Sequence, residues 1–302
     1  MKISKITLGT VNFGMSYGLR RERKKNQISE KKAVELIKKS LEYGINCFDT
    51  SPDYGNAEKI LGKTLKLQKN ILIATKVRIE ENILKDKSNN GKTFEFVKKS
   101  IDKSRTNLGR DQLDFLQIHS PTKRIIKNPY LKDIFLDFKL KKKINRIGVT
   151  VYTKDEALTA INSGWIGSVQ IPYNLINQSI DQNILKTAKK KGVFVFSRSS
   201  FLKGVLTDKI EILPKELEKV KYKIIRNLIK LNMEINDLNN LAPRFVLSNK
   251  YIGSVVFGFD NISQLKEITK LQKYKMTSEF VKRLRIFNDK SRLTDPRLWP
   301  FI

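Results

Sequence analysis

Residues 29–76 read SEKKAVELIKKSLEYGINCFDTSPDYGNAEKILGKTLKLQKNILIATK and decide the expected fold. A helical pattern begins at a Ser29 cap and ends at Gly44, a residue that tolerates the left-handed backbone of a helix end. The rest of the stretch alternates a short apolar run, a second helical pattern and another apolar run, at 45–49, 56–67 and 71–76. Short β-branched runs between amphipathic helices are typical of a parallel sheet covered by helices.

The same alternation continues along the chain. Apolar runs that predict strands lie at 3–8, 45–49, 71–76, 113–119, 146–151, 168–173, 193–197 and 254–258. Further helical patterns precede Gly109 and cover 130–142, 154–163, 180–191 and 262–271. Eight such units in a chain of 302 residues predict a closed (β/α)8 TIM barrel, with an open doubly wound sheet as the alternative.

The long interval 198–254 and the end of the chain add to this basic pattern. Additional helical patterns lie at 214–231, 235–248 and 277–289, before a tail that reads NDKSRLTDPRLWPFI (288–302). No segment rich in Pro, Gly and Ser divides the chain. We therefore expect one barrel domain, residues 1–302, with extra C-terminal helices.

Composition excludes several classes of protein. With 40% hydrophobic and 30% charged residues, the chain is expected to be a soluble globular protein. A single cysteine (Cys47) and a single histidine (His119) exclude a disulfide framework and a His/Cys metal cluster. One thiol, no signal-peptide core and no membrane-spanning run together predict a cytoplasmic location.

The net charge of +30 has two interpretations. A clustered basic face would bind nucleic acid or an anionic membrane. Lysines occur in every segment, however, with no basic tail and no basic stretch interleaved with aromatic residues. We therefore favour a solvated, lysine-rich surface and expect no specific nucleic-acid or membrane partner.

Four polar residues of complementary chemistry fall at or beyond the carboxyl ends of neighbouring predicted strands. Asp49 ends the second strand, Tyr54 follows in the next loop, Lys76 ends the third strand, and His119 ends the fourth. This rim of a (β/α)8 barrel is where catalytic side chains lie. Taken singly, each has a structural alternative: a helix cap, a loop anchor, a surface cation or a core imidazole.

Together, the four residues could transfer a proton. The phenol of Tyr54 has an ordinary pKa near ~10, and a neighbouring Lys76 ammonium would lower it toward neutral pH. A lysine in a partly dry rim needs a counter-charge, which Asp49 supplies. A neutral His119 could then donate a hydrogen bond to a substrate oxygen.

Other chemistries fit the sequence less well. Gly62-Lys63-Thr64 lacks the upstream glycine of a P-loop, and no G-x-G-x-x-G stretch occurs. The predicted fourth and seventh strands end at His119 and near Arg198, which does not suit the paired carboxylates of a glycosidase. A serine hydrolase would need a G-x-S-x-G turn, which is missing.

Several segments resemble the aldo-keto reductase superfamily, in order and through most of the chain. They are LGTVNFG (8–14), FDTSPDYGNAEKILG (48–62), IATKV (73–77) and LDFLQIHSP (113–121). The resemblance implies a (β/α)8 barrel that moves a hydride between a nicotinamide dinucleotide and a carbonyl or alcohol carbon. It also implies that Tyr54 is the acid and base, that Lys76 and Asp49 tune it, and that His119 positions the carbonyl.

The same resemblance implies cofactor-binding positions along the barrel rim. Thr150 and Gln170 would contact the carboxamide, Phe196 would stack on the nicotinamide, with barrel packing as its alternative, and Ser197 would meet the pyrophosphate. The full set is Gly9, Thr10, Thr150, Gln170, Phe196, Ser197, Gly258, Asp260, Gln264 and Glu267. Val151 and Ile268 stand where the family usually has Asn.

The expected cofactor is NADP(H), with NAD(H) as the alternative. Family habit and the nearby lysines favour NADP(H), whereas the Asp260 carboxylate would repel a 2′-phosphate. A polar loop and a cationic surface suit a sugar-like aldehyde or alcohol, and the candidate substrate contacts are Phe13, Tyr17, Asp53 and Trp299. A dinucleotide-binding sensor or regulatory subunit with vestigial chemistry is the competing functional hypothesis.

Overall fold

Eight parallel strands form a closed barrel in chain order, β1-β2-β3-β4-β5-β6-β7-β8, as the sequence predicts. The structure is a computed structural model that describes residues 2–18, 27–84, 90–289 and 291–299. The strands are β1 Ile6–Gly9, β2 Cys47–Asp49, β3 Leu72–Val77, β4 Leu113–His119, β5 Ile144–Thr150, β6 Ser168–Pro172, β7 Phe194–Arg198 and β8 Ser254–Phe257.

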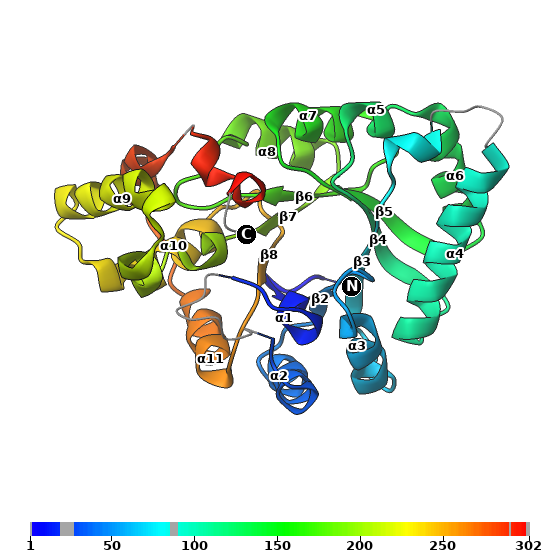
Figure 1. Ribbon diagram of the computed structural model, residues 1–302, viewed down its shortest axis with the longest axis horizontal. Coiled ribbons are helices and arrows are strands. Elements are labelled where there is room, and N and C mark those ends of the chain that lie inside the picture. Colours follow the sequence, from blue (N-terminus) through cyan, green and yellow to red (C-terminus); the bar gives the residue numbers. More distant parts are fainter. Residues whose placement is uncertain (1, 19–26, 85–89, 290, 300–302) are drawn as a thin grey trace.

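Helices surround the strands and supply the outer layer of the barrel (Figure 1). The α-helices are α1 Val11–Gly14, α2 Glu30–Glu42, α3 Ala57–Leu65, α4 Asn90–Leu108, α5 Lys123–Ile126, α6 Pro129–Leu140, α7 Lys154–Asn162, α8 Gln182–Lys190, α9 Glu218–Lys230, α10 Leu238–Leu247, α11 Ile262–Leu271 and α12 Ser278–Arg283. Short 3₁₀ helices are η1 Glu81–Leu84, η3 Leu202–Gly204, η4 Asp208–Ile212, η5 Lys215–Leu217, η6 Ile235–Asp237, η7 Leu284–Phe287, η8 Arg292–Thr294 and η9 Pro296–Leu298.

Ser29 and Gly44 begin and end α2 as the sequence predicts. The Ser29 side chain accepts a hydrogen bond from the Lys32 amide at the start of α2. Gly44 follows the helix with a φ of 78°, in the left-handed region that glycine favours. The chain can therefore turn directly into β2, which carries Asp49 at its last position.

The barrel interior contains an aromatic cluster. Phe115 lies 5.3 Å from Phe196 and Phe194 lies 4.7 Å from Phe196, between ring centroids, both in edge-to-face geometry. Cys47 and Ala74 belong to the same buried cluster. Because side chains alternate along a strand, residues two positions further along these strands face the same interior, nearer the mouth.

The predicted extra helices between the seventh and eighth strands are α9 and α10, and α12 follows α11. The C-terminal segment packs against α9: the Asn227 side-chain amide donates to the Ile286 carbonyl at 3.0 Å, and Lys223 lies 3.2 Å from Asp289. Figure 1 shows α9 beside the red helical segment that follows α11. The short helices α1 and α5 were not expected from the sequence. Residues 290 and 300–302 of the tail lie outside the described residues.

Within the described ranges, no helix is both long and apolar enough to cross a bilayer. The same residues contain no group of three or more His, Cys, Asp and Glu side chains arranged to hold a metal ion.

Candidate active site

A buried ion pair joins the ends of β2 and β3. The Lys76 ammonium donates to Asp49 Oδ2 and to the Thr50 carbonyl, both at 2.8 Å. The side chains of Lys76 and Asp49 are only 2% and 6% exposed. A charge pair held so far from water persists only when each charge has its partner, so Lys76 and Asp49 depend on one another.

The second carboxylate oxygen of Asp49 is also occupied. Gln170, which lies across the barrel on β6, donates its side-chain amide to Asp49 Oδ1 at 2.7 Å. An ionised carboxylate only accepts hydrogen bonds, so this contact fixes Gln170 with its nitrogen toward Asp49. A residue expected to contact the cofactor therefore also belongs to the hydrogen-bond network of the ion pair.

Tyr54 lies directly beside the ammonium. Lys76 Nζ is 4.9 Å from the centroid of the Tyr54 ring. The backbone of this loop lies so close to α1 that a Cβ atom on Gly14 would overlap the Tyr54 carbonyl oxygen. Only glycine permits that approach. Three of the four predicted catalytic residues thus meet at one point.

The sequence predicts that Lys76 lowers the pKa of Tyr54 overall, and this prediction is wrong. Burial has the largest effect and raises the pKa of Tyr54, while Lys76 lowers it and Asp49 raises it. Burial lowers the pKa of Lys76, but Asp49 and Tyr54 outweigh burial, and the net shift is upward. At neutral pH the phenol is therefore protonated beside a charged ammonium, which is the arrangement of a proton donor.

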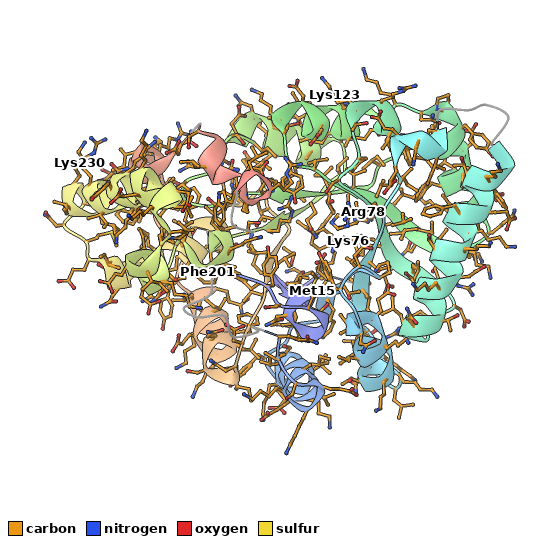
Figure 2. All side chains as sticks on the ribbon, in the orientation of Figure 1. Met15, Lys76, Arg78, Lys123, Phe201 and Lys230 are labelled. Carbon is orange, nitrogen blue, oxygen red and sulfur yellow. The ribbon has the colours of Figure 1, made fainter. Side chains whose placement is uncertain are left out.

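His119 completes the group from the end of β4 and has two charged neighbours that the sequence analysis did not connect to it. Its Nδ1 atom lies 3.2 Å from Asp53 Oδ2 and 3.4 Å from Arg78 Nη2. Burial, Lys76 and Arg78 lower the pKa of His119 to about 4, against an opposing effect of Asp53. The imidazole is therefore neutral at pH 7, as expected. Figure 2 shows Arg78 directly beyond Lys76, inside the ring of helices.

The predicted cofactor positions on β1, β5 and β8 surround the mouth. Thr10 is buried and bonds through both its amide and its hydroxyl to the Asp49 carbonyl at 3.0 Å. The Thr150 hydroxyl accepts from the Ser120 amide at 2.8 Å. Gly9 and Gly258 lie side by side, and a Cβ on Gly258 would meet only the Gly9 carbonyl oxygen, at 3.9 Å. The space beside Gly258 is therefore open, whereas a Cβ on Gly9 would meet Val256 Cγ1 at 3.0 Å.

The two predicted cofactor residues on β7, Phe196 and Ser197, have different surroundings. Phe196 is fully buried in the aromatic cluster, so its contacts are those of the packing alternative. The hydroxyls of Ser197 and nearby Ser200 are buried and have no hydrogen-bond partner among the described residues. Buried hydroxyls normally find partners. Their state fits a group with acceptor oxygens, such as a pyrophosphate.

The loop after β7 also borders a cavity of about 280 Å³. The walls come from the ends of β5, β6 and β7 and from the C-terminal tail, and include Tyr152, Pro172, Ser199, Leu202 and Thr294. Ser199, Leu202 and Lys203 all have positive φ values, between 45° and 62°. Unusual turns of this kind turn backbone N–H groups toward anions. None of the four catalytic candidates lines this cavity.

The segment expected to contact adenosine lies at the start of α11. The Gln264 side-chain oxygen accepts from the Asp260 amide at 2.9 Å, and Asp260 Oδ1 accepts from Asn12 at 3.2 Å. Glu267 is exposed one turn further along the helix. Asp260 therefore lies at the start of the segment that was expected to contact adenosine, with its carboxylate oxygen Oδ1 bonded to Asn12.

Of the four candidate substrate contacts, Asp53 lies in the site, because its Oδ2 atom is 3.2 Å from His119 Nδ1. The Tyr17 ring is 42% exposed, and Lys203 Nζ lies 5.1 Å from its centroid. Phe13 and Trp299 are buried, and the Trp299 indole donates to the Leu293 carbonyl at 2.9 Å. Packing accounts for the contacts of Phe13 and Trp299.

Arg78 and Arg198 also lie near the site and were not predicted from the sequence. Each lies two residues beyond an inward-facing position, Lys76 on β3 and Phe196 on β7, so strand alternation could have found both. The Arg198 guanidinium lies 4.1 Å from the Tyr152 ring centroid and 3.3 Å from the Val151 carbonyl oxygen. Its charge also acts to lower the pKa of Tyr54.

The fold is a (β/α)8 barrel with a buried cluster of titratable side chains at its mouth. The chain belongs to the aldo/keto reductase family, whose model matches residues 5–289. It is an oxidoreductase.

Similar proteins cover most of the chain. L-galactose dehydrogenase of Arabidopsis thaliana is 29% identical over 298 residues, which are 92% of this chain and 88% of that protein. D-arabinose 1-dehydrogenase of Saccharomyces cerevisiae is 27% identical over 262 residues, 77% of this chain and 74% of the relative. The holo form of aldo-keto reductase AKR11C1 from Bacillus halodurans shares the fold with a TM-score of 0.75, at 20% identity, over 96% of this chain and 93% of that one.

Proposed function

We propose that this protein interconverts a carbonyl and an alcohol group of a small, sugar-like substrate, using a nicotinamide dinucleotide. The observation that carries the proposal is the buried Lys76–Asp49 pair beside Tyr54, with His119 on the adjacent strand. The names of two relatives, L-galactose dehydrogenase and D-arabinose 1-dehydrogenase, support a sugar as the substrate.

The dinucleotide, when bound, supplies or accepts the hydride. In the direction of reduction, Tyr54 donates its phenolic proton to the oxygen that becomes the hydroxyl. The Lys76 ammonium stabilises the phenolate that remains, and Asp49 holds that ammonium charged and in place. His119 positions the substrate oxygen. In oxidation the same proton returns to Tyr54.

Residues of this chain fit the dinucleotide at three places. Gln170 would contact the carboxamide, the unpartnered Ser197 hydroxyl suits the pyrophosphate, and the start of α11 would contact adenosine. We include NADP(H) in the proposal, with NAD(H) as the alternative that the Asp260 carboxylate favours. Fluorescence titration with each reduced dinucleotide measures the preference, and tighter binding of NADH would reverse it.

The decisive experiment measures turnover and binding in parallel. Purified protein is mixed with NADPH or NADH and a panel of aldoses, aldehydes and ketones, and with the oxidised dinucleotides and a panel of sugars. We expect a change in nicotinamide absorbance with at least one sugar-like compound. Tyr54→Phe should keep the dinucleotide Kd and lower kcat by at least ~10². Undiminished turnover in this variant would remove Tyr54 from its role.

A further inference from the structure

Arg198, the last residue of β7, is a cation at the barrel mouth without a carboxylate partner. It forms no ion pair with an Asp or Glu side chain of the described residues. Two other cations of the mouth are paired, Lys76 with Asp49 and Arg78 with Asp53. The charge of Arg198 is therefore the one at this rim that still lacks a counter-charge of its own.

Uncharged groups hold the Arg198 guanidinium in place. Nη2 donates to the Val151 carbonyl and Nη1 donates to the Ser199 hydroxyl, both at 3.3 Å. The guanidinium carbon lies 4.1 Å from the centroid of the Tyr152 ring. These contacts orient the group without neutralising it. A guanidinium has five N–H donors, so donors remain for a further acceptor.

The carboxylate that acts on Arg198 from the C-terminal segment is already bound to another arginine. Both oxygens of Asp295 accept from Arg297 Nε at 3.0 Å, and the Arg297 guanidinium carbon lies 3.3 Å from the Tyr152 ring centroid. Burial raises the pKa of Asp295, but hydrogen bonds from Arg297 outweigh it, and the charge of Arg198 adds to the lowering. One carboxylate thus faces two guanidinium groups, so this part of the rim keeps a net positive charge.

The Arg198 side chain starts from the face of β7 that points into the barrel. Successive side chains of a strand point to opposite faces, so Arg198 shares the inward face with Phe196, whereas Ser197 lies on the other face. The charge of Arg198 reaches the catalytic group: burial raises the pKa of Tyr54, and Lys76 and Arg198 act to lower it. A substrate beside Tyr54 therefore lies in the field of this unpaired cation.

We propose that Arg198 binds an anionic group of the substrate, so that the preferred substrate is a sugar carrying a carboxylate or a phosphate. This rests on the proposed function and narrows its substrate class. A guanidinium binds the oxygens of either group through two parallel hydrogen bonds. The bound oxyanion supplies the counter-charge that the described residues do not give to Arg198.

Three sugars that differ only at carbon 6 measure the preference. D-glucose is neutral, D-glucuronate carries a carboxylate and D-glucose 6-phosphate carries a phosphate. Saturation-transfer difference NMR with the protein and NADP⁺ gives a Kd for each sugar. We expect at least one anionic sugar to bind roughly 10- to 100-fold more tightly than D-glucose, the effect of a hydrogen bond to a charged group. Equal binding of all three, or weaker binding of both anionic sugars, would overturn the proposal.

Two substitutions of Arg198 and one control locate the preference. Arg198→Met should abolish it, whereas Arg198→Lys, which keeps the charge but loses the planar fork, should keep part of it. Arg124→Met removes one positive charge from a side chain of α5 that is 69% exposed, and it should leave all three Kd values unchanged. A preference that persists in Arg198→Met would overturn the proposal.

The pyrophosphate of the dinucleotide is a second source of the same anionic chemistry. Fluorescence titration with NADPH separates the two sources, because Arg198→Met should leave the Kd of NADPH unchanged. A loss of NADPH affinity in this variant would assign Arg198 to the pyrophosphate and overturn the proposal.

Steady-state kinetics give a readout that a merely structural role would not produce. In Arg198→Met, kcat/KM should fall roughly 10- to 100-fold for the preferred anionic sugar, mainly through KM, and should change little for D-glucose. An equal fall for both sugars contradicts the proposal. Sugar binding does not depend on turnover, so a protein that binds the anionic sugar through Arg198 without converting it would refute only the proposed function.

Discussion

Replacing Lys76 by Met tests how much the buried Lys76–Asp49 ion pair contributes to the stability of the folded protein. The substitution keeps an unbranched side chain of similar length but removes the ammonium that donates to Asp49 and to the Thr50 carbonyl. Asp49 then keeps only the Gln170 amide as a partner in a site where it is 6% exposed. Removing one partner of a buried pair costs about 3 to 5 kcal/mol, which we expect at pH 7.

Urea unfolding followed by circular dichroism measures this loss. The double variant Lys76→Met/Asp49→Asn removes the stranded charge, so it should be more stable than the sum of the two single losses predicts, by about 1 to 3 kcal/mol. Lys141→Met is the control, because it breaks an ion pair with Asp137 whose side chains are 59% and 39% exposed. Its cost should stay under about 1 kcal/mol.

The size of the loss decides between a supporting and an incidental ion pair. A loss under about 1 kcal/mol at pH 7, which is the size expected of an exposed pair, would refute the reasoning.

Three further predictions follow from buried or tightly packed groups. The pKa of His119 falls from 6.5 to about 4, so the native protein should lose up to about 3 kcal/mol of stability as the pH drops through this window, and urea unfolding of His119→Gln should show no such loss. Gly14→Ala should displace the backbone of Tyr54 and lower kcat at least ~10-fold in the assay described above, whereas Gly164→Ala, at an open position, should cost only stability. Burial raises the pKa of Cys47 to about 12, so a thiol reagent should label it in urea and leave it unmodified in the native protein.

The barrel was predictable because its signals are local. Ser29 and Gly44 mark the ends of a helix, and apolar runs between such helices have no other stable arrangement than a covered parallel sheet. The grouping of Asp49, Lys76 and His119 followed from the same reasoning, since the carboxyl ends of parallel strands meet at one rim. Strand boundaries differed by a few residues, as with β1, predicted at 3–8 and found at Ile6–Gly9.

The electrostatics were not predictable from residue types. The sequence indicates that Lys76 lies near Tyr54, but the net pKa shift depends on how far the phenol is buried, which is a property of the packed loop. Likewise, Arg78 and Asp53 are 25 positions apart, and only the folded loop brings both to the same nitrogen of His119. Which of these two oppositely charged side chains lies closer to His119 depends on interatomic distances, which the sequence does not give.

Asp49 contacts both a residue proposed for proton transfer and a residue proposed for dinucleotide binding. One of its oxygens holds the Lys76 ammonium and the other holds the Gln170 amide from the far side of the barrel. Because an ionised carboxylate accepts only, Gln170 must turn its amide nitrogen toward Asp49, which leaves its side-chain oxygen for another partner. An Asp49→Asn substitution removes that requirement and weakens the Lys76 contact at once. Its effect on turnover therefore combines proton donation with dinucleotide orientation, and only substitutions at Lys76 and Gln170 separate the two.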